Sequence, residues 1–157
     1  MDFEYILAFG FNAKHQKINR IVPWINISIF NPKNESRTID AYCLIDSGSD
    51  TTFFTSEIGE YLGYDIAIGK PFLTYGIGGS SIKIYYHRVG IKVEDPENKH
   101  EPIEYKDIMG FTKSGFPISL PQQTGILGSM GFFRNVSVFL DYPKLISINE
   151  KVSSAIN

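Results

Sequence analysis

The chain has 157 residues, of which 43% are hydrophobic and 20% are charged, so a disordered or fibrous protein is excluded and one domain over residues 1–157 is expected. A net charge of −2, with Lys and Arg spread along the chain, argues against a nucleic-acid-binding protein, which needs a clustered basic face. No apolar run approaches the roughly 18 residues that a membrane span needs, so no membrane partner is expected.

Apolar and polar residues alternate along the first third of the chain, a pattern typical of strands. The alternation predicts one strand from Phe3 to Phe11 and a second from Ile21 to Ile29, with Pro23 near its start or on an edge. A turn at residues 31–35 then leads to a third strand, Thr38 to Ile45.

The middle of the chain predicts a short helix and two further strands. Ser56 to Leu62 has helical spacing of its apolar residues, and Gly63 suits the C-terminal cap of a helix. Lys70 to Tyr75 and Ser80 to Val93 are predicted strands, followed by an exposed polar loop at Glu94 to Pro102.

The last third contains fewer clear signals. Isolated glycines and prolines interrupt Ile103 to Pro121, for which no element is predicted. Val136 to Leu140 and Leu145 to Ile148 predict a hairpin, and the polar residues Glu150 to Asn157 are expected to be frayed. The whole pattern predicts an all-β fold with one or two short helices.

One acidic turn follows a strongly apolar strand. Tyr42 to Ile45 leads into Asp46-Ser47-Gly48, and a carboxylate at the end of a buried strand is costly unless hydrogen bonds or a function compensate for it. Two interpretations stay open on this motif alone. Asp46 can be a turn residue that accepts hydrogen bonds from the following amides, or it can be a reactive carboxylate.

Three motifs, in this order, resemble those of the retropepsin-like single-domain aspartic peptidases of bacterial and archaeal type. Leu44 to Thr51 is similar to the catalytic turn of that family, Gly76-Ile77-Gly78-Gly79 to the tip of its flap, and Gly125 to Gly128 to the apolar-apolar-Gly element beside the turn. The resemblance covers most of Pro23 to Ile148 and implies a closed acid-protease-type β-barrel.

The resemblance also implies an aspartic endopeptidase that acts on extended peptides or unfolded proteins. In that chemistry two carboxylates share one proton, so that one activates a water molecule while the other polarises the peptide carbonyl. This chain has a single Asp-Ser-Gly turn, so a homodimer in which two Asp46 residues face each other is implied, without metal or organic cofactor.

The family's functional residues carry over by motif. The resemblance makes Asp46 catalytic, Ser47 and Gly48 the active-site turn, and Ile126, Leu127 and Gly128 the structural support of the site. The implied substrate-binding residues are Ser49, Asp50, Tyr75, Gly76, Ile77, Gly78 and Gly79.

Ser129 departs from the family pattern, because many relatives carry at this position an arginine that pairs with the acid after the catalytic turn. Asp50 thus loses its expected partner, and Arg88, Lys113 and Arg134 remain open as replacements. The departure keeps a second hypothesis in play, a catalytically weak or inactive dimerisation or peptide-binding module of the same fold. A third, an unrelated β-barrel that binds small ligands, rests on the alternating strands alone.

The remaining signals are negative. The N-terminus lacks the basic and apolar segments of a secretory signal, from which we expect a cytoplasmic protein. His15, His87 and His100 lack metal-ligand spacing. Cys43, the single cysteine, excludes an intrachain disulfide and is expected to be a small core side chain.

Overall fold

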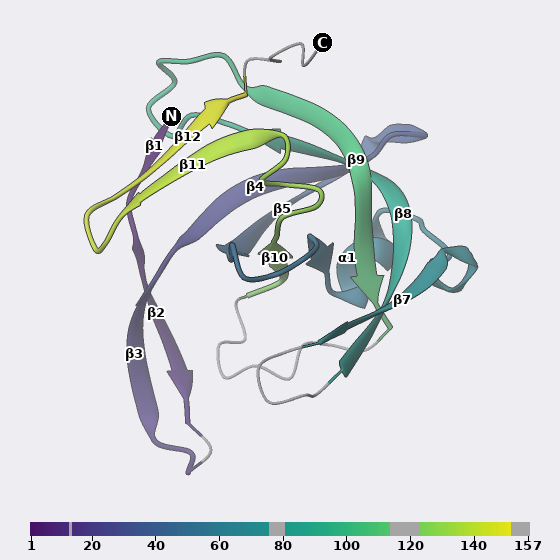
Figure 1. Ribbon diagram of the computed structural model, residues 1–157, viewed down its shortest axis with the longest axis horizontal. Helices are drawn as coiled ribbons and strands as arrows, with labels where there is room; N and C mark the ends of the chain where they lie inside the picture. The colour runs from purple at the N-terminus through teal and green to yellow at the C-terminus, as the bar shows by residue number, and fades with distance from the viewer. Residues whose placement is uncertain (13, 76–80, 114–122, 152–157) are drawn as a thin grey trace.

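The structure is a computed structural model that describes residues 1–12, 14–75, 81–113 and 123–151 (Figure 1). Strands dominate it, with one α-helix, α1 (Ser56–Tyr61), and one 3₁₀ turn, η1 (Ile66–Ile68), among the described residues. The strands are β1 (Asp2–Phe3), β2 (Ile6–Phe11), β3 (Lys17–Val22), β4 (Trp24–Asn31), β5 (Asn34–Ile45), β6 (Phe53–Phe54), β7 (Lys70–Tyr75), β8 (Ser81–Val93), β9 (Ile103–Thr112), β10 (Gly125–Leu127), β11 (Val136–Asp141) and β12 (Leu145–Glu150). Neither helical segment is long and apolar enough to cross a membrane.

Six strands close into a β-barrel, which confirms the predicted fold class. Their order is β4-β5-β10-β6-β9-β8, and β8 pairs again with β4 to close the ring. Strand β7 pairs with β8 outside the ring, and β1, β12 and β11 form a separate three-stranded sheet. Two pairs are parallel, β10 with β5 and β6 with β9, and these bring distant parts of the sequence together at the centre of the molecule.

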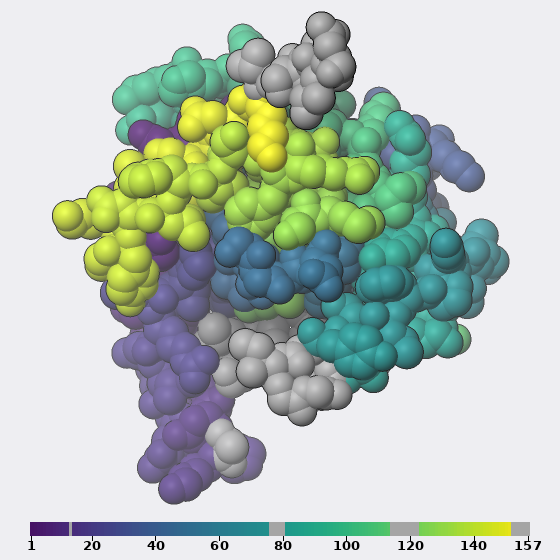
Figure 2. All heavy atoms as spheres, in the orientation of Figure 1, coloured from purple at the N-terminus to yellow at the C-terminus, as the bar shows by residue number. Residues whose placement is uncertain are grey.

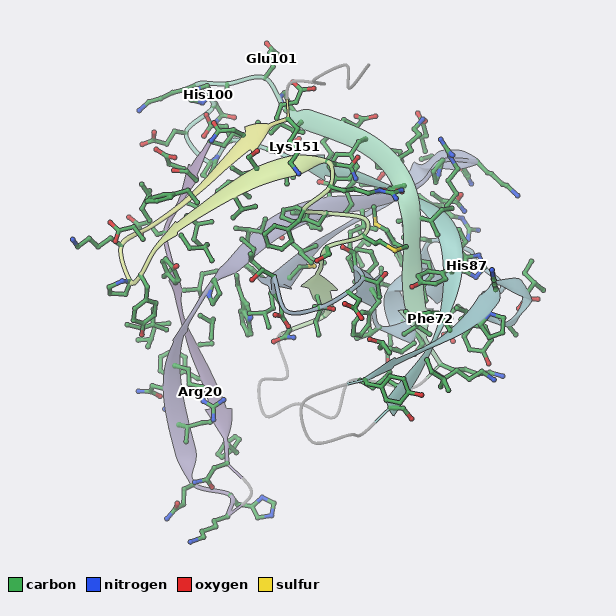
Figure 3. All side chains as sticks on the ribbon, in the orientation of Figure 1. Arg20, Phe72, His87, His100, Glu101 and Lys151 are labelled. Carbon is green, nitrogen blue, oxygen red and sulfur yellow. The ribbon has the colours of Figure 1, made fainter. Side chains whose placement is uncertain are left out.

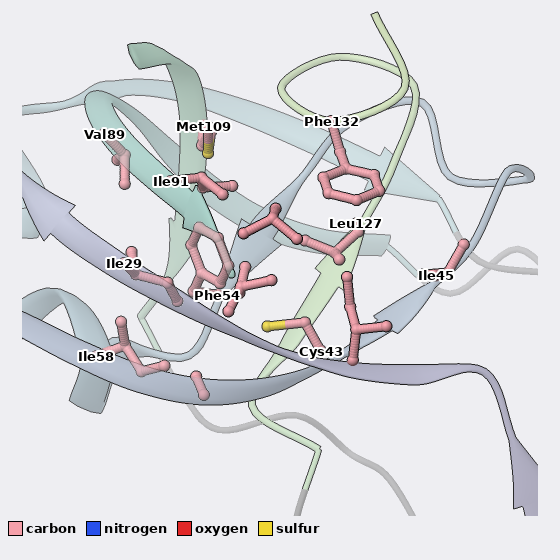
Figure 4. Close-up of a cluster of buried hydrophobic side chains, with 14 of the residues drawn as sticks. Ile29, Cys43, Ile45, Phe54, Ile58, Val89, Ile91, Met109, Leu127 and Phe132 are labelled. Atoms are coloured by element: carbon pink, nitrogen blue, oxygen red, sulfur yellow. The ribbon is translucent and has the colours of Figure 1, made fainter. Parts of the chain in front are cut away.

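The barrel interior is filled by the alternating residues that the sequence predicts. Ile25, Ile27 and Ile29 of β4 point inward with at most 1% exposure, and Cys43 and Ile45 of β5 pack with them (Figure 4). Burying an aliphatic side chain of this size contributes roughly 1.5–3 kcal/mol before the loss of conformational entropy is counted. This core is what fixes the end of β5.

The predicted strand from Phe3 to Phe11 is wrong in extent. Phe3 belongs to β1 and is buried against β12, whereas Leu7, Phe9 and Phe11 lie on β2 with their side chains exposed. Alternation indicates an extended chain but does not identify its partner, and the two halves pair with different strands.

The predicted strand from Ile21 to Ile29 is also divided, because Pro23 lies between β3 and β4. Proline lacks an N–H for the strand ladder, so it is placed best where one strand ends and the next begins. The expectation that Pro23 lies near the start of a strand is therefore confirmed, since β4 begins at Trp24, although the chain on its N-terminal side belongs to a different sheet.

Two local predictions are confirmed. Helix α1 ends as expected, since Gly63 adopts a left-handed φ of 81° just beyond the cap residue Leu62. The C-terminal hairpin forms from β11 and β12 in direct register, Asp141 opposite Leu145. Strand β9, in contrast, was not predicted from the sequence.

Candidate active site

The Asp46 turn begins where β5 leaves the barrel. The Asp46 N–H donates to the Leu127 carbonyl at 3.1 Å, and the Ser49 N–H donates to the Asp46 carbonyl at 3.1 Å, which closes the turn. The Gly48 N–H donates to Asp46 Oδ1 at 3.0 Å. Asp46 is half-buried, and among the described residues none donates a hydrogen bond to its second oxygen, Oδ2. The turn therefore orients the carboxylate and leaves one oxygen available.

Strand β10 lies directly beside this turn. Its parallel register pairs Ile126 with Leu44 and Leu127 with Ile45, and Leu127 is fully buried. Gly128 follows at the point of closest approach, where a Cβ atom would lie 2.4 Å from the Thr51 carbonyl oxygen. Only glycine fits there, because contacts under 3.0 Å require the backbone to shift.

The chain after Gly128 is bound to the chain after Asp46 by a short ladder. The Ser129 N–H donates to the Ser49 carbonyl at 2.8 Å, and the Met130 N–H donates to the Asp50 carbonyl at 3.0 Å. The Thr52 N–H donates in return to the Met130 carbonyl at 2.7 Å. Ser129 thus contributes to this ladder through its backbone N–H, which any residue except proline could supply.

Thr52 is a site residue that the sequence reasoning missed. It is fully buried, and its Oγ1 accepts a hydrogen bond of 3.0 Å from the Gly128 N–H. Its carbonyl accepts another from the Gly110 N–H of β9, so Thr52 joins the turn, β10 and β9. The available signal was a polar residue directly before the apolar pair Phe53-Phe54, since buried polar groups are hydrogen-bonded.

Replacing Gly128 by alanine is expected to lower the free energy of unfolding by about 1–3 kcal/mol, because the added methyl group overpacks against the Thr51 backbone. Urea unfolding monitored by circular dichroism measures the change. Ser129→Ala, at the exposed neighbour, is the matched control and is expected to stay within about 0.5 kcal/mol. Equal stability of Gly128→Ala and wild type would contradict the close approach.

A second polar cluster supports the same region from β9. Asp107 is 5% exposed, and its carboxylate accepts hydrogen bonds from Arg134 Nε at 2.6 Å and Asn135 Nδ2 at 2.7 Å, with Arg134 Nη2 completing an ion pair. Burial raises the pKa of the Asp107 carboxyl, but the hydrogen bonds from Arg134, Asn135 and the Ile108 amide outweigh it, so the pKa lies below its ordinary value.

Arg134→Met is expected to cost about 1–2 kcal/mol of stability at pH 7, because it leaves the buried Asp107 charge without its guanidinium partner. Because the pKa of Asp107 is lowered in the folded state, the stability that the pair contributes is fully present above the unfolded-state pKa of about 3.9. It declines as the pH falls through the folded-state pKa. Urea unfolding at pH 7 and pH 3 checks both statements. Lys106→Met removes the surface pair with Glu35 as the control and is expected to change stability by less than about 1 kcal/mol. A difference between Arg134→Met and wild type that grows at pH 3 would contradict the assignment.

The predicted residues after Asp46 lie on the surface of the turn. Ser47 and Asp50 are exposed, and Ser49 Oγ donates to the Thr51 carbonyl at 2.8 Å. Within the described part of the chain no ion pair reaches the Asp50 carboxylate. Arg134 binds Asp107 and is therefore not the substitute partner of Asp50.

The predicted flap is described only at its base. Tyr75 ends β7 opposite Ser81 of β8, and its side chain is 69% exposed. The predicted tip, Gly76, Ile77, Gly78 and Gly79, lies outside the described residues.

Cys43 is a core side chain, as predicted. It is fully buried, and burial raises the pKa of its thiol, which makes it a poor nucleophile. Its Sγ lies where a Cβ on Gly125 would meet it at 2.6 Å, so thiol and glycine fit together between β5 and β10.

Comparison with known proteins identifies the fold. No protein-family model matches the sequence, and no curated protein matches it. The structure is similar to a retropepsin-like aspartic protease from Rickettsia conorii, with a TM-score of 0.53 and 18% identity over 94% of this chain and 92% of that one. A weaker likeness, with a TM-score of 0.40 and 22% identity over 68% of this chain and 81% of the other, is to EIAV protease complexed with the inhibitor HBY-793.

Proposed function

Because the chain has the fold of the retropepsin-like aspartic proteases, we propose that it is an aspartic endopeptidase in which the Asp46 carboxylates of two copies act on one extended peptide. One observation carries the proposal. Backbone hydrogen bonds to Leu127 and Gly48 hold Asp46 in place, yet Oδ2 has no partner among the described residues. Asp65, which caps η1, also has one oxygen without a described partner, so the place of Asp46 matters as well: it lies at the end of barrel strand β5, directly beside β10.

The proposed chemistry needs two carboxylates close together. Like charges about 3 Å apart cannot both ionise comfortably, so the pair holds one proton. The ionised Asp46 removes a proton from water as its oxygen attacks the peptide carbonyl carbon, while the protonated Asp46 donates a hydrogen bond to the carbonyl oxygen. As the C–N bond breaks, the Asp46 carboxyl that accepted the water proton donates it to the leaving amine nitrogen, and the pair again holds one proton.

A second copy is proposed as the source of the second carboxylate. Asp46-Ser47-Gly48 is the one Asp-Ser-Gly motif in the sequence, and other aspartates have separate roles. Asp65 caps η1, Asp95 accepts three backbone N–H groups of its own loop, and Asp107 binds Arg134. A two-fold dimer places two identical Asp46 turns face to face.

Roles follow for the neighbouring residues. Ser47, exposed on the turn, is proposed to hydrogen-bond across the dimer, and Gly48 lets the substrate backbone approach. Ser49, Asp50 and Tyr75 are proposed to contact the peptide.

The test is the dependence of activity on enzyme concentration. Cleavage of an unfolded protein is measured between pH 3 and 7 over a wide dilution series of the chain. A dimeric site predicts that turnover per chain falls steeply once the concentration passes below the dimer dissociation constant. Turnover per chain that stays constant while sedimentation shows conversion to monomer would contradict the shared site.

A further inference from the structure

Strands β2 and β3 form a hairpin that stands apart from the barrel, and we call residues 6–22 the arm. The two strands pair only with each other, Ile6 opposite Val22 through to Phe11 opposite Lys17. The arm projects as a separate ribbon in Figure 1, and Figure 2 shows it protruding on the face where the segment after β5 is visible. A two-stranded ribbon is marginally stable by itself, so an uncovered arm of this length indicates a missing partner.

One face of the arm is apolar and exposed. Leu7, Phe9 and Phe11 lie on this face of β2. On β3, Ile21 lies opposite Leu7, and the polar residues Asn19 and Lys17 lie opposite Phe9 and Phe11. The four apolar side chains are between 42% and 59% exposed. The other face is covered at its root, where Ala8 and Val22 pack on Trp24. A contiguous apolar face of this kind marks an interaction surface.

The arm is also basic. It carries Lys14, Lys17 and Arg20 and has no acidic residue, so it contributes +3 to a chain whose net charge is −2, and the remainder carries −5. Arg20 lies along the ribbon (Figure 3), and within the described part of the chain none of the three forms an ion pair. The arm therefore suits a partner surface that is apolar and acidic.

Such a surface exists at the root of the arm itself. A groove of about 640 Å³ is lined by apolar residues, among them Ile6, Trp24 and Tyr42. Its charged lining is three carboxylates, those of Asp2, Glu4 and Glu97, and one cation, Lys144, so it is acidic on balance. Tyr42 is 47% exposed. Asp95 holds the loop of Glu97 in place by accepting its N–H at 3.1 Å. Of the arm of the same chain, Ile6 belongs to this groove, and Leu7 and Phe9 line a smaller adjoining pocket with Trp24 and Tyr42.

The groove adjoins the Asp46 turn. Trp24 pairs with Leu44, and the Ile45 N–H donates to the Pro23 carbonyl at 3.0 Å, one residue before Asp46. At about 3.3 Å per residue, Tyr42 lies roughly 13 Å from Asp46, and the arm reaches roughly 17 Å from Ile6 to Phe11. The arm is longer than the distance from Tyr42 to Asp46, so its tip can cross a two-fold axis near Asp46 and meet the near side of another copy.

We propose that the arm of each chain docks into the groove of a second copy, so that two chains exchange arms around the Asp46 turns. The inference rests on the proposed function, because that function requires a second copy on this side of the molecule. The exchange is self-complementary, as a two-fold interface demands, since each chain supplies one basic apolar arm and one acidic apolar groove. The partner is thus a copy of this chain.

Charge reversal tests the exchange. The double variant Lys17→Glu with Arg20→Glu reverses the charge of the arm. The double variant Glu4→Lys with Glu97→Lys reverses the charge of two groove residues. Each pair is expected to raise the dimer dissociation constant at least about tenfold at low salt, and the four changes together are expected to restore it to within about threefold of wild type. Lys33→Glu with Lys70→Glu, exposed charges away from the arm, is the control and leaves the constant unchanged.

Sedimentation velocity measures association, thermal unfolding verifies that each variant is folded, and the emission of Trp24, the single tryptophan, reports on the groove as the dimer dissociates. A dimer that neither reversal weakens overturns the exchange and leaves the proposed peptidase standing. Reversals that keep the dimer but raise KM assign the arm to substrate and also overturn the exchange. A wild-type chain that is monomeric at every concentration overturns both proposals.

Discussion

Replacing Asp46 by asparagine is expected to reduce the rate of peptide cleavage by at least about 10³-fold. The amide can neither remove a proton from water nor share one with its counterpart, and positioned acid–base groups contribute 10²–10⁴-fold each. Folding is expected to survive, because the asparagine oxygen can still accept the Gly48 N–H that Asp46 Oδ1 now accepts at 3.0 Å. Steady-state cleavage of an unfolded protein at the optimal pH measures the loss.

The matched control is Asp65→Asn. Asp65 is an exposed turn carboxylate whose Oδ1, like that of Asp46, accepts a backbone N–H, from Ala67 at 3.3 Å, but it caps η1 and does not belong to the Asp46 turn. The Asp65→Asn protein is expected to cleave the substrate as fast as wild type. An Asp46→Asn protein that cleaves as fast as wild type would eliminate the carboxylate mechanism.

Phe54→Ala is expected to have the largest effect on stability, a loss of about 3–5 kcal/mol. Phe54 is fully buried on the two-residue strand β6, which lies between β10 and β9. Its ring centroid is 6.0 Å from that of Phe111, and its ring fills the space beside Gly125. Removing the ring leaves a cavity where the parallel strands meet beside the Asp46 turn (Figure 4).

Urea unfolding measures this cost, and Phe72→Ala on β7 is the matched control. Phe72 is 43% exposed, so losing its ring is expected to cost less than about 1.5 kcal/mol. We also expect Phe54→Ala to lose cleavage activity at temperatures where wild type is stable, since β6 helps to position β10. A loss below 1 kcal/mol for Phe54→Ala would contradict the packing described here.

The fold class could be predicted because its signals are local. Alternating isoleucines in β4, the apolar run before Asp46 and the glycine after α1 each specify a conformation by themselves. The closure of the barrel and the neighbours of Asp46 depend on pairings between distant segments, such as β10 with β5. Local signals do not predict these pairings, and the resemblance of the ordered motifs to a known family indicated them instead.

The features that the sequence did not predict were missed for physical reasons as well. Strand β9 was missed because Gly110, which reads as a strand breaker, sits where Ile84 and Phe53 approach the backbone and a Cβ would meet Ile84 at 2.8 Å. Thr52 and the Asp107–Arg134 pair depend on contacts between residues that are distant in sequence, which periodicity does not reveal. The exposed face of β2 was unpredictable for the opposite reason, since its alternation is the same as that of a core strand.

The central claim is that two Asp46 carboxylates from different chains form one site, and a mixing experiment tests it most directly. Wild type and Asp46→Asn are combined at equal amounts, allowed to exchange subunits, and assayed at a fixed total concentration well above the dissociation constant. If both carboxylates are required, only dimers of two wild-type chains are active, and activity falls to about one quarter of that of the unmixed wild type. Activity of about one half would show that each chain works independently and would contradict the shared site.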